Sequence, residues 1–149
     1  MSFGQRPVLI IPEFGRIEYF GSYWKGAVQL GVFGKRFDLI VRAGRDGPSA
    51  AQVAAMSQLV SDAASVRSTA TVPMLAIHRD APGFPGDGSA AGELIWDLLQ
   101  PEQIGVLDVS YYGDGRIAIL ITFGSSLHPD FAPAIETADG HFVQVLSGT

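Results

Sequence analysis

The residues best suited to acid–base or metal chemistry are three histidines, each two positions from an aspartate. Two of them share one short segment, at residues 128–130 (His-Pro-Asp) and 139–141 (Asp-Gly-His). Zinc binds imidazole and carboxylate groups where no thiolate is available, and the chain has no cysteine. The spacing matches no H-x-x-x-H pattern, however, and turn chemistry accounts for Asp139. We predict no metal and no cofactor, and keep His128 and His141 as candidate binding residues.

The third histidine begins a His-Arg-Asp sequence at residues 78–80, which are the first letters of a kinase catalytic loop. The chain has no asparagine and no kinase glycine-rich loop, so a polar helix end explains this motif better. The glycines between residues 83 and 88 lack the lysine of a phosphate loop, and the serines after Gly124 lack a G-x-S-x-G elbow. No residue reaches a catalytic assignment. The alternative is a small-ligand or metal-binding protein, or a hydrolase, that uses His78, His128 or His141.

Aromatic side chains supply a second class of candidate binding residues. Phe84 is the only large apolar residue in a proline- and glycine-rich stretch from Asp80 to Ala91, which we expect to be a flexible loop. Tyr111 and Tyr112 are adjacent, so on a strand one ring would point to each face of the sheet. Aromatic residues are enriched among interface hot spots. We therefore predict that Phe84, Tyr111 and Tyr112 contact a partner.

Composition limits the classes of partner. The chain of 149 residues carries a net charge of −5, with only two lysines, which argues against sequence-independent binding of nucleic acid. No apolar run approaches the ~20 residues of a membrane helix, and the apolar run at residues 8–11 is too short for a signal peptide. We expect a single cytoplasmic domain spanning residues 1–149, with 47% hydrophobic residues for its core.

Period-two alternation in the first third of the chain predicts strands. One or two short edge strands are expected between residues 7 and 20. A hairpin follows, in which Trp24 and Val28 share the buried face of one strand and Phe37 and Leu39 that of the next. We expect Trp24 to lie in the core beneath the following helix.

Helical patterns occupy the middle of the chain. Ser49 and Gln52 have the spacing of a capping box, and an apolar stripe continues to about Ser68. Residues 71–78 fit either a short second helix that begins near Pro73 or a buried strand. A further helix of two turns is expected at residues 93–99, before Pro101.

Strands return in the last third. Alternation predicts a strand at residues 107–111, a two-residue turn at Asp114-Gly115, and a central strand at residues 117–123. Asp139-Gly140 predicts a second hairpin turn between residues 135–137 and 142–145. Segregated strands and helices predict an α+β fold. In it, N- and C-terminal strand blocks form one antiparallel sheet, and two or three central helices pack on one face.

Three features of the chain resemble small bacterial α+β domains. They are Trp24-Lys25-Gly26, the run Phe33-Gly34-Lys35-Arg36-Phe37-Asp38-Leu39, and a helix opened by proline, serine and glutamine. Some domains of this kind are immunity proteins of polymorphic toxin systems. The resemblance implies no catalytic residues and a role in protein binding.

We therefore expect a non-enzymatic protein-binding module, in its most specific form an immunity-type protein that occludes a toxin. A homo-oligomeric structural protein, such as a homodimer joined through a sheet edge, is a further alternative.

Overall fold

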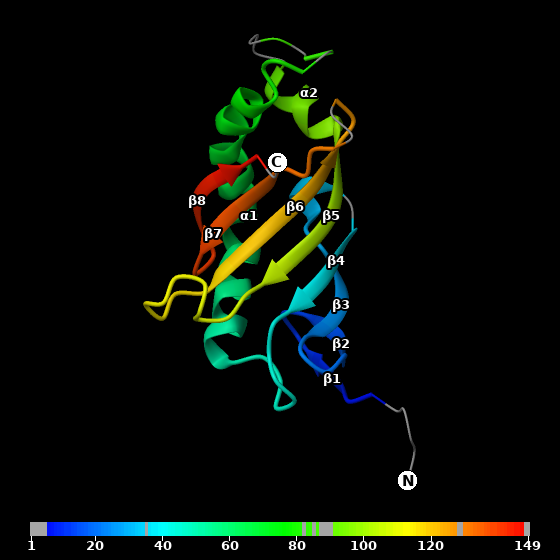
Figure 1. The fold of residues 1–149 in the computed structure, drawn as a ribbon, viewed down its shortest axis with the longest axis vertical. Helices are drawn as coiled ribbons and strands as arrows, with labels where there is room; N and C mark the ends of the chain where they lie inside the picture. The colour runs from blue at the N-terminus through cyan, green and yellow to red at the C-terminus, as the bar shows by residue number, and fades with distance from the viewer. Residues whose placement is uncertain are drawn as a thin grey trace.

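Eight strands form one sheet in which every strand lies beside its neighbours in the sequence (Figure 1). The computed structural model describes residues 6–34, 36–81, 83–84, 86, 91–127 and 130–147. The strands are β1 (Val8–Ile11), β2 (Gly15–Tyr19), β3 (Trp24–Gln29), β4 (Arg36–Val41), β5 (Leu99–Val106), β6 (Ala118–Ser125), β7 (Ala134–Ala138) and β8 (His141–Leu146). All neighbours pair antiparallel except β4 and β5, which are parallel. A parallel pair needs a long crossover, and the helices provide it.

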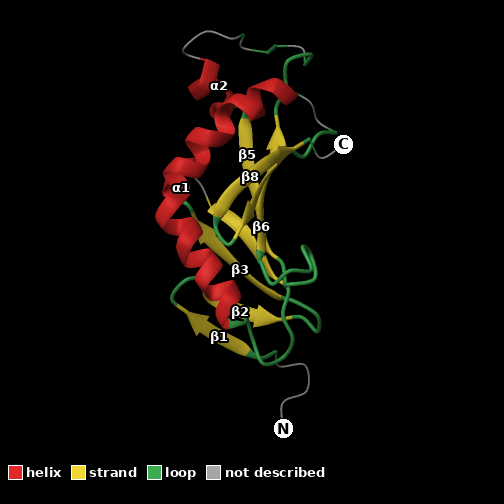
Figure 2. Cartoon of the chain, turned by 90° about the vertical axis from the view of Figure 1, so that its left-hand side faces the viewer, coloured by secondary structure: helices red, strands yellow, loops and turns green. Residues whose placement is uncertain are grey.

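The crossover is α1 (Ala50–Ile77), followed by the short helix α2 (Ala91–Asp97). Both helices lie on the same side of the sheet, and in the described part of the chain the other side carries only loops (Figure 2). The predicted capping box is confirmed, since the Ser49 hydroxyl accepts from the Gln52 N–H and the Gln52 side chain accepts from the Ser49 N–H. Helix α1 therefore begins where the sequence indicates.

Gln52 has a second role that the capping pattern did not predict. Its buried amide Nε2 donates to the carbonyl of Arg42, at 2.7 Å, and to that of Leu107, at 3.1 Å. These carbonyls directly follow β4 and β5, so one side chain ties the ends of both central strands to the start of α1. A buried amide such as that of Gln52 is costly to leave without its partners.

The predicted end of the first helix is wrong. Helix α1 continues for 28 residues through Pro73, so neither the separate helix nor the strand expected at residues 71–78 forms. Proline removes one backbone donor from a helix interior. The apolar stripe compensates, because Ala70 and Met74 are fully buried on either side of Pro73. The following helix ends at Asp97, and β5 then begins at Leu99, before Pro101.

The strand expected at residues 107–111 and its two-residue turn are also wrong. Residues 107–117 form a loop between β5 and β6. Asp108 accepts from the N–H of Ser110, and such a turn competes with strand pairing. The second predicted turn is confirmed: Asp139 and Gly140 join β7 to β8, with positive φ at both residues.

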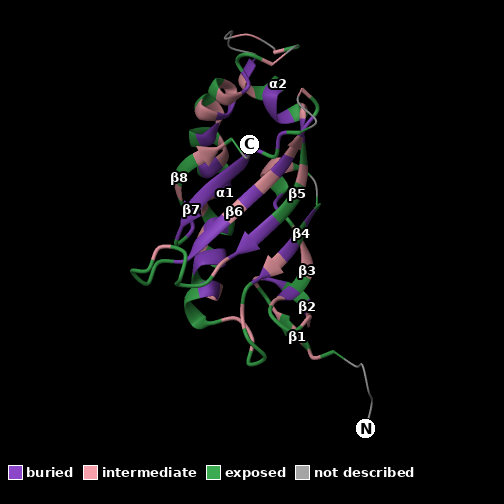
Figure 3. Ribbon diagram, viewed as in Figure 1, coloured by how far each residue is buried: buried purple, intermediate pink, exposed green. Residues whose placement is uncertain are grey.

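The core lies between the helices and the inner face of the sheet, where the buried residues of the strands and of α1 meet (Figure 3). Trp24 belongs to it, as predicted, with its indole N–H donating to the Gly44 carbonyl at 2.8 Å. An α+β fold with helices on one face is thus confirmed, although the sheet is larger than expected and includes a parallel pair. Within the described part of the chain, no helix is long and apolar enough to cross a membrane.

Candidate functional site

The helix-free face of the sheet has a gap at its centre. Cross-strand partners share a face, and one row of partners runs across this face from β2 to β8. Its members are Glu18, Lys25, Ile40, Gly105, Leu120, Glu136 and Gln144. Gly105 on β5 lies between Ile40 and Leu120 and contributes no side chain, so the row is interrupted in the middle of the sheet.

This gap forms the floor of a hollow of about 530 Å³, which we call the Gly105 hollow. Besides Gly105, its lining consists of Arg42, Gln103, Leu107, Asp108, Ser110, Tyr111, Leu120 and Thr122. A Cβ built on Gly105 would meet nothing closer than the Gln103 side chain, at 3.6 Å. The glycine is therefore not required by the strand geometry, and its effect is to keep the hollow deep.

One wall of the hollow is Tyr111, whose ring packs against that of Tyr112. The Tyr111 ring, 43% exposed as a residue, lies edge-on to the Tyr112 ring with centroids 4.9 Å apart. The Tyr112 hydroxyl donates to Glu136 Oε2, and the Arg116 guanidinium lies 4.4 Å from the Tyr112 ring centroid. Gln144 Nε2 donates to the other oxygen of Glu136, at 2.9 Å. These contacts fix Tyr112, which in turn orients the exposed Tyr111.

The charged groups around the hollow are held in defined protonation states. Hydrogen bonds from the Ser110 hydroxyl and N–H lower the pKa of Asp108, so its carboxylate is a weak base. Burial, and then the hydrogen bond to Glu136, raise the pKa of Tyr112 well above that of a free phenol. The hollow therefore presents a carboxylate of lowered basicity at Asp108 and, at Tyr111, a phenol whose pKa is raised by burial.

The structure separates the two histidines that it describes. His78 is 1% exposed, and its Nδ1 lies 2.8 Å from the Met74 carbonyl while its Nε2 lies 3.0 Å from the Ser125 hydroxyl. His141 is exposed beside Asp62, with Nδ1 3.6 Å from Oδ2. Asp62 and His78 are sixteen positions apart on α1, or about 24 Å at 1.5 Å per residue. His78 and His141 therefore cannot serve one site.

The hydroxyl–imidazole pair of Ser125 and His78 has the composition of an activated nucleophile. Both partners are buried, and Ser125 Oγ also accepts from the Leu127 N–H at 3.3 Å. Neither Ser125 nor His78 is among the residues that line the hollows of the described structure. The pair therefore stabilises the junction between α1 and β6.

The remaining candidates divide between the site and its surroundings. Tyr111 lines the Gly105 hollow, and Tyr112 packs against Tyr111 without lining the hollow itself. Phe84 is half-buried and lies outside the hollow, and His128 lies outside the described residues. No group of three or more histidine, aspartate or glutamate side chains that could hold a metal occurs among the described residues. Arg42 and Gly105 give no signal in the sequence, because only the parallel pairing of β4 with β5 brings them together. Glu136 gives none because the pairing of β6 with β7 places it on this face.

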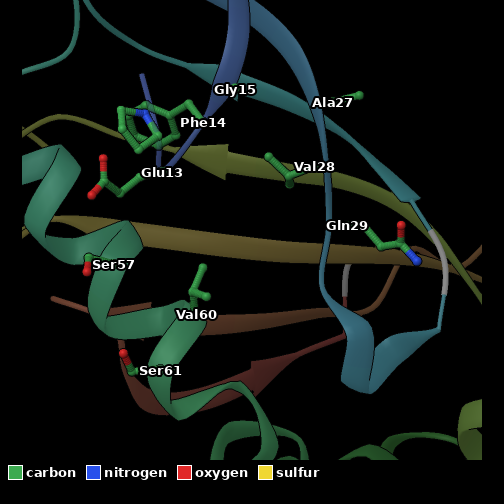
Figure 4. Close-up of a pocket in the computed structure, with 10 residues that line it drawn as sticks. Glu13, Phe14, Gly15, Ala27, Val28, Gln29, Ser57, Val60 and Ser61 are labelled. Carbon is green, nitrogen blue, oxygen red and sulfur yellow. The ribbon is translucent and has the colours of Figure 1, made fainter. Parts of the chain in front are cut away.

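A second hollow, of about 500 Å³, opens on the helix side of the sheet (Figure 4). The turn between β1 and β2 forms one wall, and the end of β3 and the middle of α1 form the others. Val60 from α1 and Val28 from β3 line it, with Glu13 and two serines of α1 among its polar residues. It marks the place where α1 and the N-terminal strands separate.

With this geometry established, similarity to known proteins adds no assignment. The sequence matches no protein-family model, and neither the curated proteins nor the solved structures give a significant match.

Proposed function

We propose that this chain is a protein-binding module that contacts its partner through the helix-free face around the Gly105 hollow. The observation that carries the proposal is the composition of this hollow. An exposed tyrosine and an arginine flank a concave surface in the middle of a sheet face that no helix covers. Tyrosine and arginine are among the residues enriched at protein interfaces and among their hot spots.

Preorganisation of the aromatic pair supports the proposal. An interface loses free energy when a flexible side chain must be immobilised, at about 0.5–1.5 kcal/mol for each. Tyr111 is spared much of this cost because its ring already rests on Tyr112, which Glu136 and Arg116 hold. A partner side chain that enters the hollow would meet a rigid wall.

In its most specific form, the proposed module occludes a basic partner such as a toxin. The net charge of −5 favours encounter with a positively charged surface. The neighbouring reading frames test this form directly. A toxin-like frame beside the gene is expected, whereas an isolated metabolic operon would contradict the toxin form.

Affinity capture from the native cell, followed by calorimetric titration of the captured protein, tests the general proposal. Tyr111→Ala should weaken binding at least tenfold, as loss of a hot spot does. Gly105→Leu should weaken it similarly, because the side chain fills the hollow while the strand has room for its Cβ. The control is Val72→Ala, on the far side of α1, where the side chain is 73% exposed.

Thermal melts of all three variants should show folded protein, so that lost binding can be assigned to the surface. If the two hollow variants bind the partner as tightly as the wild type and the Val72 control, the partner does not use this face and the proposal is wrong.

A further inference from the structure

The most apolar strand of the sheet, β1, lies at one of the two edges of the sheet. Strand β1 has the sequence Val-Leu-Ile-Ile and, among the described residues, pairs only with β2. Val8 is 41% exposed and Ile10 78%, and both lie on the helix-free face, since the alternate residue Leu9 packs against the core. Proteins usually protect such edges with charges, prolines or bulges. Between Pro7 and Pro12, β1 has none of these.

The free backbone groups of this edge belong to the same two residues. The Pro7 carbonyl accepts from the Tyr19 N–H, so Pro7 faces β2. The backbone groups of successive residues in a strand point alternately to its two sides. The N–H and C=O groups of Leu9 and Ile11 therefore also point toward β2. The N–H and C=O groups of Val8 and Ile10 therefore point away from the sheet, toward solvent.

We infer that β1 pairs antiparallel with β1 of a second copy of this chain, and that Leu9 faces Leu9 across the two-fold axis. In this register Val8 of each copy lies opposite Ile10 of the other. Both are residues whose backbone groups point outward, so the junction forms four hydrogen bonds. Pro7 lies opposite Ile11, where its missing N–H is not needed.

The side chains favour the same register. Val8 pairs with Glu18 and Ile10 pairs with Arg16 on β2. Each row across the junction therefore contains an arginine, two apolar residues and a glutamate, with opposite charges at its two ends. One strand can slide by two residues so that Ile10 lies opposite Ile10. The facing Ile10 residues then form only two hydrogen bonds, and the row has an arginine at both ends.

The other edge of the sheet lacks this complementarity. Strand β8 carries exposed His141 and Gln144, and a register shift between Glu136 and Thr137 interrupts its pairing with β7. Bulges and polar side chains discourage edge-to-edge pairing. Strand β1 is thus the edge suited to an isologous contact, which closes as a dimer and does not propagate.

Sedimentation velocity of the full chain over a range of concentrations tests the dimer. We expect a concentration-dependent dimer whose dissociation constant rises at least tenfold in Ile10→Lys. Val72→Lys, an equally exposed substitution on α1, should leave it unchanged. A monomer at every concentration, equal effects of the two lysine variants, or assemblies that grow beyond the dimer would overturn the inference.

Disulfide trapping tests the register, and the absence of native cysteine removes any background. A mixture of Val8→Cys and Ile10→Cys proteins should cross-link, because facing residues have Cα atoms about 5.5 Å apart. Each variant alone should not, since like residues would be roughly 9 Å apart. Cross-linking of Ile10→Cys alone would show the slipped register instead. The hollow variants Tyr111→Ala and Gly105→Leu should dimerise normally, so the dimer and the proposed binding function can fail independently.

Discussion

The two halves of the sheet have the same topology and very different surroundings. Strands β1–β4 and β5–β8 are both four-stranded meanders, joined in parallel at the centre. Strand β7, with the sequence Ala-Ile-Glu-Thr-Ala, is buried along its whole length, whereas the purely apolar β1 alternates between exposed and half-buried. Burial of a strand is therefore set by what covers its faces and its edges, and only in part by its own hydrophobicity.

A glycine of the C-terminal half that combines positive φ with close contact to the α1 backbone should give the largest effect. Gly140 has φ +88°, and a Cβ there would lie 2.7–2.8 Å from α1 atoms, including backbone. We expect Gly140→Ala to reduce the free energy of unfolding by about 3–4 kcal/mol, from overpacking and backbone strain together. Gly15→Ala, in the N-terminal half, has φ +71° and no atom within 4 Å, so only the strain of about 1–2 kcal/mol remains. Chemical denaturation measures both, and equal losses would contradict the asymmetry.

The side chain that ties the two halves together should give the next effect. Gln52→Leu leaves the carbonyls after β4 and β5 without their donor, and we expect a loss of about 3 kcal/mol in unfolding free energy. Ser49→Ala removes the cap but keeps both carbonyl bonds, and should cost about 1 kcal/mol. If urea denaturation shows a larger loss of unfolding free energy for Ser49→Ala than for Gln52→Leu, the two carbonyl bonds of Gln52 contribute less than the Ser49 cap.

An effect smaller than those of Gly140→Ala and Gln52→Leu is expected at the buried carboxylate of β7. Tyr112→Phe removes a hydrogen bond to Glu136 and should cost about 1–2 kcal/mol near neutral pH. The folded-state pKa of Tyr112 is raised above the unfolded value of about 10, so its contribution is complete below that pH and is lost as pH rises further.

Denaturation of the wild type and the variant at about pH 8 and about pH 11 should therefore show the difference shrinking in alkali. Gln144→Leu removes the other bond to Glu136 without a phenol, so its cost should not follow the tyrosine titration. If the difference in unfolding free energy between the wild type and Tyr112→Phe were constant across this range, the raised pKa of Tyr112 would not contribute to stability.

Local sequence signals predicted the elements that local interactions determine. The capping box at Ser49, the Asp139-Gly140 turn and the hairpin that includes Trp24 all depend on residues close in sequence. The loop at residues 107–117 was mistaken for strands, because its alternating apolar residues give the same pattern. Its conformation depends instead on the Asp108 turn and on the contact between Tyr112 and Glu136.

The site was predictable only in part, for the same reason. Tyr111 and Tyr112 stood out by residue type. Gly105 and Arg42 had no local signal, because their role follows from the register between β4 and β5, which residues distant in sequence determine. The continuation of α1 through Pro73 likewise depends on tertiary burial, which outweighs the local preference of proline.

The parallel pairing at the centre of the sheet also has a consequence for synthesis of the chain. Asp38 pairs with Gln103, so β4 has no partner on that side until α1, α2 and the start of β5 have left the ribosome. During this interval the nascent chain would expose a strand edge at β4 as well as at β1, beside the apolar side chains of Phe37 and Leu39. Exposed strand edges and apolar surface make folding intermediates prone to aggregation. Early folding of α1 over these strands would shorten that exposure, and its capping box favours such an early start.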